Sequence, residues 1–220
     1  MKKFILLSCL LCTSLFALAQ DKNFHIYLCL GQSNMEGNAK IEPQDTCNID
    51  ERFLVMSAVD CPSLGRTIGQ WYKAVPPLAR CHTGLTPADY FGRTLVERLP
   101  DSIRVGVINV AVGGCRIELF DEEKREDYIA SQPEWLKNIV KAYDNNPYRR
   151  LKELAKEAQK AGVIKGILLH QGESNTGDKE WPQKVKRVYE ILLRDLNLQA
   201  KDVPLLAGEL VHADQNGQCA

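Results

Sequence analysis

Four runs of apolar and β-branched residues punctuate the chain, and polar segments follow each of them. They predict buried strands at residues 24–30, 103–112, 163–170 and 203–210. The stretch 40–86 between the first two runs is rich in Cys, Pro and Gly, and we expect a hairpin there with 53–57 as one arm. No repeat, linker or second domain is evident, so residues 20–220 are predicted to form one domain.

Three amphipathic helices are predicted between these strands. Thr86 can cap the first helix, which begins at Pro87. Asn146 can start the second, which ends before Gly162, and Pro182 begins the third. Their apolar stripes are Ala88, Phe91, Leu95 and Leu99; Leu151, Leu154, Ala155 and Ala158; and Val185, Val188, Tyr189, Leu192, Leu193 and Leu196. Strands that alternate with helices predict an α/β fold, here a three-layer α/β/α sandwich with a parallel sheet.

The first residues have the anatomy of an export signal. Lys2 and Lys3 precede an apolar run at 4–18, and Ala17-Leu18-Ala19 has the small-x-small form of a cleavage site. We expect residues 1–19 to be a signal peptide cleaved after Ala19, and the mature protein to be secreted or periplasmic. The run is too short to favour a membrane span. A lipoprotein anchored at Cys9 or Cys12 is the weaker alternative, because both lie inside the apolar run.

Cleavage would leave six cysteines, at 29, 47, 61, 81, 115 and 219. Export permits disulfides, and Cys47, Cys61 and Cys81 are the better candidates because they lie in a loop-like region. Cys29 lies in a predicted core strand and is interpreted as a buried thiol. No Cys-x-x-Cys pair occurs in the mature chain, which argues against a thiolate zinc site.

The balance of charged residues limits the class of molecule that this protein is expected to bind. The 220 residues carry 28 Lys plus Arg and 28 Asp plus Glu. This balance predicts neither nucleic-acid binding nor attraction to an anionic surface, and favours a neutral or mildly charged small molecule.

Three polar motifs each follow a predicted strand: Gly31-Gln32-Ser33-Asn34-Met35, Gly113-Gly114-Cys115-Arg116 and His170-Gln171-Gly172-Glu173-Ser174-Asn175. Ligands of open parallel sheets bind at the carboxyl ends of the strands, so we expect the motifs to meet at one edge. Together they offer the parts of a serine nucleophile site. Ser33 supplies a hydroxyl and a backbone N–H; further oxyanion donors are Gly113 or Gly114, and the amide of Gln171 or Asn175. Met35 stands where a Gly-x-Ser-x-Gly elbow needs glycine, which argues against the α/β-hydrolase fold.

Other site residues admit two interpretations. Ser33 alone could be a turn serine, and the glycine pair only a tight turn. Gln32, Arg116 and Glu173 are weak candidates for substrate binding; Arg116 could equally form a structural ion pair, and Glu173 could act as a base or, as we favour, fix its loop.

Aromatic rings and histidines are further candidates. Trp71, Trp135 and Trp181 could stack on sugar rings, although core packing is the default for each. Among the four histidines, at 25, 82, 170 and 212, only His170 is placed to serve as a base.

At these motifs the chain resembles the SGNH-hydrolase superfamily, and within it the carbohydrate esterases that include sialate O-acetylesterases and acetylxylan esterases. The segments that carry the resemblance are LGQSNMEG, NVAVGGCRIELF and LLHQGESN, with TGLTPADYFGRTLVERLP and VPLLAGEL between and after them. The resemblance implies a flavodoxin-like sheet, an O-acetylated carbohydrate as substrate, Ser33 as nucleophile, an oxyanion hole from Ser33, the glycine pair and Gln171 or Asn175, and no metal or cofactor.

One departure qualifies the resemblance. The family carries its base in a late Asp-x-x-His block, and no Asp-x-x-His occurs in this sequence, which ends at VHADQNGQCA. We therefore expect a C-terminally truncated esterase domain that lacks the catalytic His and Asp and is impaired as an enzyme. The alternative is a sugar-binding, non-catalytic remnant of the same fold.

Overall fold

A six-stranded sheet forms the centre of the molecule in the computed structural model, which describes residues 20–211. Its order is β3-β2-β4-β1-β5-β6, and every neighbouring pair is parallel except β2 with β3. The strands are β1 (Asp21–Gly31), β2 (Phe53–Met56), β3 (Trp71–Lys73), β4 (Arg104–Ala111), β5 (Gly162–His170) and β6 (Leu205–Ala207). The predicted α/β fold is confirmed, with a mostly parallel sheet.

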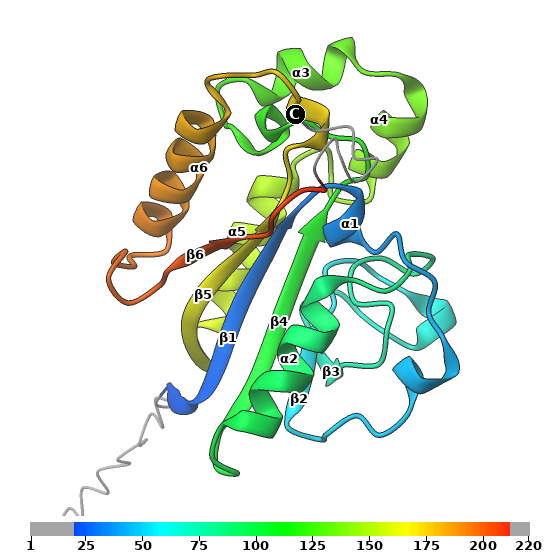
Figure 1. Ribbon diagram of the computed structural model, residues 1–220, viewed down its shortest axis with the longest axis vertical. Helices are drawn as coiled ribbons and strands as arrows, with labels where there is room; N and C mark the ends of the chain where they lie inside the picture. Colours follow the sequence, from blue (N-terminus) through cyan, green and yellow to red (C-terminus); the bar gives the residue numbers. More distant parts are fainter. Residues whose placement is uncertain (1–19, 212–220) are drawn as a thin grey trace, which may run out of the picture.

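Helices cover both faces of this sheet (Figure 1). They are α1 (Ser33–Glu36), α2 (Pro87–Arg98), α3 (Arg125–Ser131), α4 (Glu134–Lys141), α5 (Pro147–Ala158) and α6 (Trp181–Asp195), with short 3-10 turns η1 (Pro43–Thr46), η2 (Pro62–Leu64), η3 (Ile117–Phe120) and η4 (Glu173–Asn175). Alternate residues of each strand bury into two separate cores. One core contains β1 residues such as Ile26 and Leu28 with α5 and α6, and the other contains Cys29 with α2.

The predicted strands all form, with one correction: the strand expected at 203–210 spans only β6. The expected hairpin with 53–57 as one arm is confirmed, since β2 pairs with β3 in antiparallel register. Because β2 also pairs with β4, this hairpin is part of the main sheet and β3 forms its antiparallel edge.

The helix caps follow the sequence, and the predicted apolar face of α2 packs against the core. Thr86 caps α2 and Asn146 caps α5 through their side-chain oxygens. Of the predicted stripe in α2, Ala88 is fully buried, and Phe91, Leu95 and Leu99 are partly buried and pack against the same core. Asp89, Gly92 and Val96 are buried as well. Gly92 makes a close approach, since a methyl group on it would lie 2.0 Å from Cε2 of Phe53. The helix therefore turns its glycine face toward β2.

Strand register brings the three motif segments level with one another. Gly31 at the end of β1 pairs with Ala111 of β4 on one side and with His170 of β5 on the other. Each motif therefore leaves the sheet at the same height, with the Ser33 segment in the middle. Figure 1 shows α1, α3 and α4 gathered at this end of the sheet, toward which the arrow of β4 points.

One disulfide joins Cys61 to Cys81, which is one of the pairings expected from the loop-like region. Cys47 is free and exposed, and Cys29 is a buried thiol as predicted, with a pKa that burial raises above its usual range. Cys219, His212 and the predicted signal peptide lie outside the described residues. Within residues 20–211 no helix is long and apolar enough to cross a membrane.

Candidate active site

Ser33 is the first residue of α1, directly beyond the central strand. The chain turns sharply there, since Gly31 has φ +156° and a methyl group on it would lie 2.1 Å from the carbonyl oxygen of His170. The backbone N–H of Gln32 donates to that carbonyl oxygen at 3.0 Å, which fixes the turn to β5. Ser33 is half-buried, and neither its hydroxyl nor its backbone N–H forms a hydrogen bond within residues 20–211. Both groups are therefore available to a ligand.

The short helix α1 is held by contacts from distant segments. The carbonyl of Met35 accepts hydrogen bonds from Thr86 Oγ1 and Asn109 Nδ2, both at 2.8 Å. Glu36 forms an ion pair with Arg80 at 2.6 Å, and both side chains are largely buried. These contacts restrict the position of Ser33 even though a helix of 4 residues has little stability of its own.

The glycine pair lies against Ser33. A methyl group on Gly113 would lie 3.9 Å from Cβ of Ser33 and 2.8 Å from Oε2 of Glu36. Only glycine therefore fits beside the serine without displacing Glu36. The backbone N–H of Gly113 donates to no acceptor among the described residues, so it adds a second free donor next to that of Ser33.

Gln32 ties the first motif to the third. Its side chain is buried, and its Oε1 accepts from Gln171 Nε2 at 3.2 Å and from the backbone N–H groups of Gly172 and Ser174 at 3.3 and 3.2 Å. Ser174 Oγ in turn donates to the carbonyl of Gly114 at 3.0 Å, which links the second motif to the third. The three motifs thus meet at one edge, as predicted. Gln32, predicted as a weak substrate contact, is buried, and its carbonyl oxygen has three donors within the protein.

The amides of Gln171 and Asn175 are also used within the protein. Gln171 Nε2 donates to Asn175 Oδ1 at 2.8 Å and to the Cys115 carbonyl at 3.2 Å, and its Oε1 accepts from the indole of Trp181. Asn175 Nδ2 donates to Glu118 and Asp178, each at 3.1 Å. We refer to Gln32, Gln171 and Asn175 as the amide cluster. The side-chain N–H groups of Gln171 and Asn175 stabilise the junction of the motifs.

Glu173 and His170 form the other side of the site. Asn34 Nδ2 donates to Glu173 Oε1 at 2.9 Å, so Glu173 fixes the loop to α1, in agreement with the structural role we favoured. His170 Nδ1 lies 3.6 Å from the same oxygen. Within the described residues, His170 Nδ1 and Glu173 Oε2 are buried without hydrogen-bond partners. This unsatisfied pair stands at the end of β5, level with Gly31.

Comparison with known proteins shows the family of this chain. Residues 23–219 match the family described as carbohydrate esterase, sialic acid-specific acetylesterase. The chain belongs to this esterase family. Because the match spans nearly the whole described chain, it includes all three motif segments.

Solved structures support the same fold. A protein from Arabidopsis thaliana is similar with a TM-score of 0.61 and 23% identity over 85% of this chain and 74% of that chain. NanS is similar with a TM-score of 0.59 and 19% identity, over 90% of this chain and 70% of that one. A carbohydrate acetylesterase from Xanthomonas citri is similar with a TM-score of 0.55 and 22% identity, over 83% of this chain and 40% of that chain. At these identities the likeness shows that the esterase fold is shared.

Behind the third motif, a charged network is centred on Lys184 of α6. Lys184 Nζ lies 2.8 Å from Glu118 and 2.7 Å from Asp178, the two carboxylates that also bind Asn175. The hydrogen bond from Lys184 lowers the pKa of Asp178 to about 2, and its two carboxylate partners raise the pKa of Lys184. Burial opposes ionisation of Glu118, but Lys184 and Asn175 outweigh it and its pKa is lowered. Arg116 lies 3.5 Å from both carboxylates, which favours its ion-pair interpretation.

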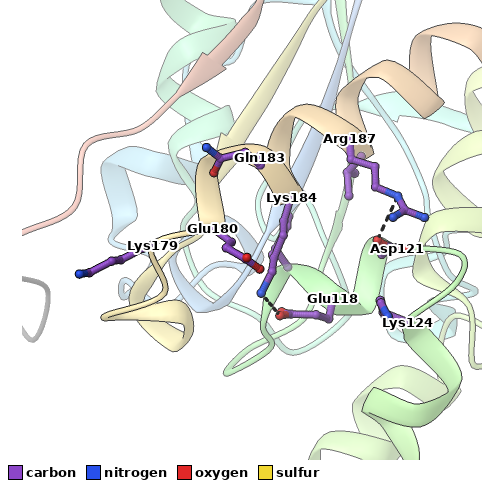
Figure 2. Close-up of a pocket in the computed structure, with 10 residues that line it drawn as sticks. Glu118, Asp121, Lys124, Lys179, Glu180, Gln183, Lys184 and Arg187 are labelled. Carbon is purple, nitrogen blue, oxygen red and sulfur yellow. Dashed lines mark hydrogen bonds and ion pairs between the residues drawn. The ribbon is translucent and has the colours of Figure 1, made fainter.

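This network lines a hollow of about 670 Å³ between α6 and η3 (Figure 2). Figure 2 shows Lys184 directed at Glu118 and Arg187 directed at Asp121, whose guanidinium and carboxylate lie 3.5 Å apart. The hollow contains none of Ser33, Gly113 and Gly114. Lys184 pairs with Glu118 and Arg187 pairs with Asp121 across it, so we assign the hollow a structural part in holding α6 behind the site.

Two of the three tryptophans have packing roles, as the default interpretation held. Trp71 packs edge-on against Phe24 at 4.8 Å between ring centroids, and Trp181 donates to Gln171. Trp135 differs, since it is 55% exposed. Neither Glu36 nor Arg80 is among the predicted site residues, and the one sequence signal for Glu36 is its position within the segment LGQSNMEG.

No group of three or more His, Cys, Asp or Glu side chains in residues 20–211 is arranged to hold a metal ion.

Proposed function

We propose that this chain is a serine esterase of SGNH type that removes O-acetyl groups from carbohydrates, of the sialate O-acetylesterase or acetylxylan esterase kind. The observation that carries the proposal is the free hydroxyl and N–H of Ser33 beside the free N–H of Gly113. Membership of the carbohydrate esterase family supports the class of substrate.

The geometry suggests how the reaction proceeds. Ser33 Oγ attacks the carbonyl carbon of the acetyl group. The carbonyl oxygen then becomes an anion that accepts hydrogen bonds from the N–H groups of Ser33 and Gly113. The alcohol of the sugar leaves with a proton, and water then releases acetate from the serine. Gln171 and Asn175 support this oxyanion site by holding the second and third motifs together.

A serine hydroxyl is a weak nucleophile unless a base takes its proton. His170 is the described histidine at this edge, so it is the first residue to test as that base. Export through the predicted signal peptide is part of the proposal, and the Cys61–Cys81 disulfide supports it because disulfides persist in oxidising compartments.

Replacement of the nucleophile tests the proposal. Ser33→Ala is expected to lower kcat/KM for p-nitrophenyl acetate and for O-acetylated sialic acid by about 10³-fold or more, as expected for a lost nucleophile. Ser63→Ala, an exposed serine remote in sequence from the motifs, is the matched control and should leave turnover unchanged. Activity should persist in EDTA. A fully active Ser33→Ala protein would show that the serine is structural.

A second candidate is a sugar-binding protein without catalysis. It is favoured by one observation: no histidine or carboxylate in residues 20–211 hydrogen-bonds to the Ser33 hydroxyl. Calorimetric binding of O-acetylated sialic acid, with turnover no higher than that of Ser33→Ala, would select this candidate. Turnover that Ser33→Ala abolishes would exclude it.

A further inference from the structure

Trp135 is displayed at the surface by a helix that is otherwise anchored in the core. It is the second residue of α4, and its side chain is 55% exposed. The next residue, Leu136, and Val140 one turn later are fully buried. The helix is therefore fixed by its apolar face while the indole projects away from that face, at low cost in conformational freedom because the ring has two side-chain torsions.

The indole lies directly against the second glycine of the pair. A methyl group on Gly114 would lie 2.6 Å from Cη2 of Trp135 and 3.4 and 3.6 Å from Cζ3 and Cζ2. These three atoms form the benzenoid edge of the indole, so the ring meets Gly114 edge-on. An edge-on contact leaves the broad faces of the ring and its N–H uncovered by Gly114, and the N–H has no hydrogen-bond partner in residues 20–211.

The two glycines connect this ring to the nucleophile. Gly113 faces Ser33 and Gly114, the next residue, faces Trp135. The hydrogen bond from Ser174 Oγ to the carbonyl of Gly114 fixes the pair between them. In an acetyl ester of a sugar, only the ester oxygen separates the carbonyl carbon from the carbon skeleton of the sugar. A carbonyl placed at Ser33 and Gly113 therefore brings the sugar beside the next residue of the loop.

We propose that Trp135 is the platform on which the sugar of the O-acetylated substrate stacks while its acetyl group occupies Ser33. This rests on the function proposed above and adds the residue that selects a sugar ester over other acetyl esters. The C–H faces of a pyranose are apolar and match the face of an indole, while the free indole N–H can donate to a sugar hydroxyl.

The test separates recognition of the sugar from ester chemistry. Trp135→Ala is expected to raise KM for O-acetylated sialic acid so that its kcat/KM falls about tenfold more than that for p-nitrophenyl acetate, which has no sugar. Trp135→Phe keeps an aromatic face and should recover most of the difference. Tyr90→Ala is the control: Tyr90 is 49% exposed on α2 but contacts Asp45 and Arg93, so both substrates should be unaffected.

Equal losses on both substrates in Trp135→Ala would overturn the proposal, because they would mean that the ring merely supports Gly114. The same holds if neither substrate is affected. If wild type has no esterase activity, calorimetry in the Ser33→Ala background decides: weaker binding of O-acetylated sialic acid after Trp135→Ala supports the platform, and unchanged binding contradicts it. The outcome for Trp135 is thus distinct from the outcome for the esterase proposal.

Discussion

At the scale of single residues, Glu36 is constrained from two sides close to Ser33. One of its carboxylate oxygens pairs with Arg80 and the other lies where a side chain on Gly113 would be. It thereby joins the Ser33 helix, the glycine pair and the segment next to the disulfide. A largely buried charge whose partner is removed keeps its desolvation cost, so this pair should be sensitive to changes in either member.

Single and double substitutions at this pair should show that coupling. Glu36→Gln and Arg80→Met are each expected to lower the free energy of unfolding by about 1–3 kcal/mol, because each leaves a partly buried charge without its partner. The double variant should lose less than the sum of the two, as for residues in direct contact. Urea denaturation measures all four proteins, and strictly additive losses would contradict a direct interaction.

At the scale of elements, Lys184 of α6 pairs with Glu118 of η3 and with Asp178, and these ion pairs hold α6 against η3. Asp178 and Glu118 have pKa values below their ordinary range, so their ionised forms stabilise the folded state. This contribution is complete above their unfolded pKa values of about 4 and is lost as pH falls toward about 2, the pKa of Asp178. The raised pKa of Lys184 has the opposite sign, since its contribution is lost only as pH rises above its usual value.

Acid unfolding tests this fastening. Lys184→Met should reduce the loss of stability between about pH 5 and about pH 2, because the carboxylates then lack the cation that lowers their pKa. Lys186→Met is the matched control on the same helix, since Lys186 is 72% exposed and pairs with Glu190 at 3.7 Å across the surface. Urea midpoints measured across this pH range compare the three proteins. Identical pH dependence in the wild type and Lys184→Met would refute the assignment.

Elements also show where sequence reasoning succeeded and where it stopped. Local patterns were enough for β1, β4, β5 and the caps at Thr86 and Asn146, because periodicity and capping depend on neighbouring residues. The close approach of Gly92 in α2 to Phe53 was not predicted, because it is a contact between segments far apart in sequence.

For the candidate site as well, some features could be predicted from the sequence and others could not. Its three motifs were visible from the order of strands and polar segments. Two other features depend on three-dimensional packing that no local pattern encodes. They are the hydrogen bond between the amides of Gln171 and Asn175 and the ion pair of Glu36 with Arg80.

At the scale of the whole molecule, the disulfide closes a long excursion of the chain. Cys61 and Cys81 are 20 residues apart, and the segment between them contains β3 and Arg80. A cross-link of this span restricts the unfolded chain and thereby stabilises the folded one.

Removing the disulfide should lower global stability. Cys61→Ser with Cys81→Ser is expected to reduce the free energy of unfolding by about 3 kcal/mol, on the basis of the loop length. Cys47→Ser, which replaces an exposed free thiol, serves as the control and should change stability little. Chemical denaturation under non-reducing conditions measures the difference. Equal stability of the double variant and the control would mean that the excursion is held by its packing alone.

The hydrogen bond from the Trp181 indole to Gln171 has a consequence for observing the molecule in solution. The indole hydrogen is held by a side chain of the amide cluster, so it can exchange with deuterium from solvent when that cluster opens. Its resonance lies in a region of the proton spectrum with few others, and among the tryptophans of the described chain only Trp181 donates such a bond. The exchange rate of this one hydrogen therefore reports the opening of the junction between the motifs without any measurement of turnover.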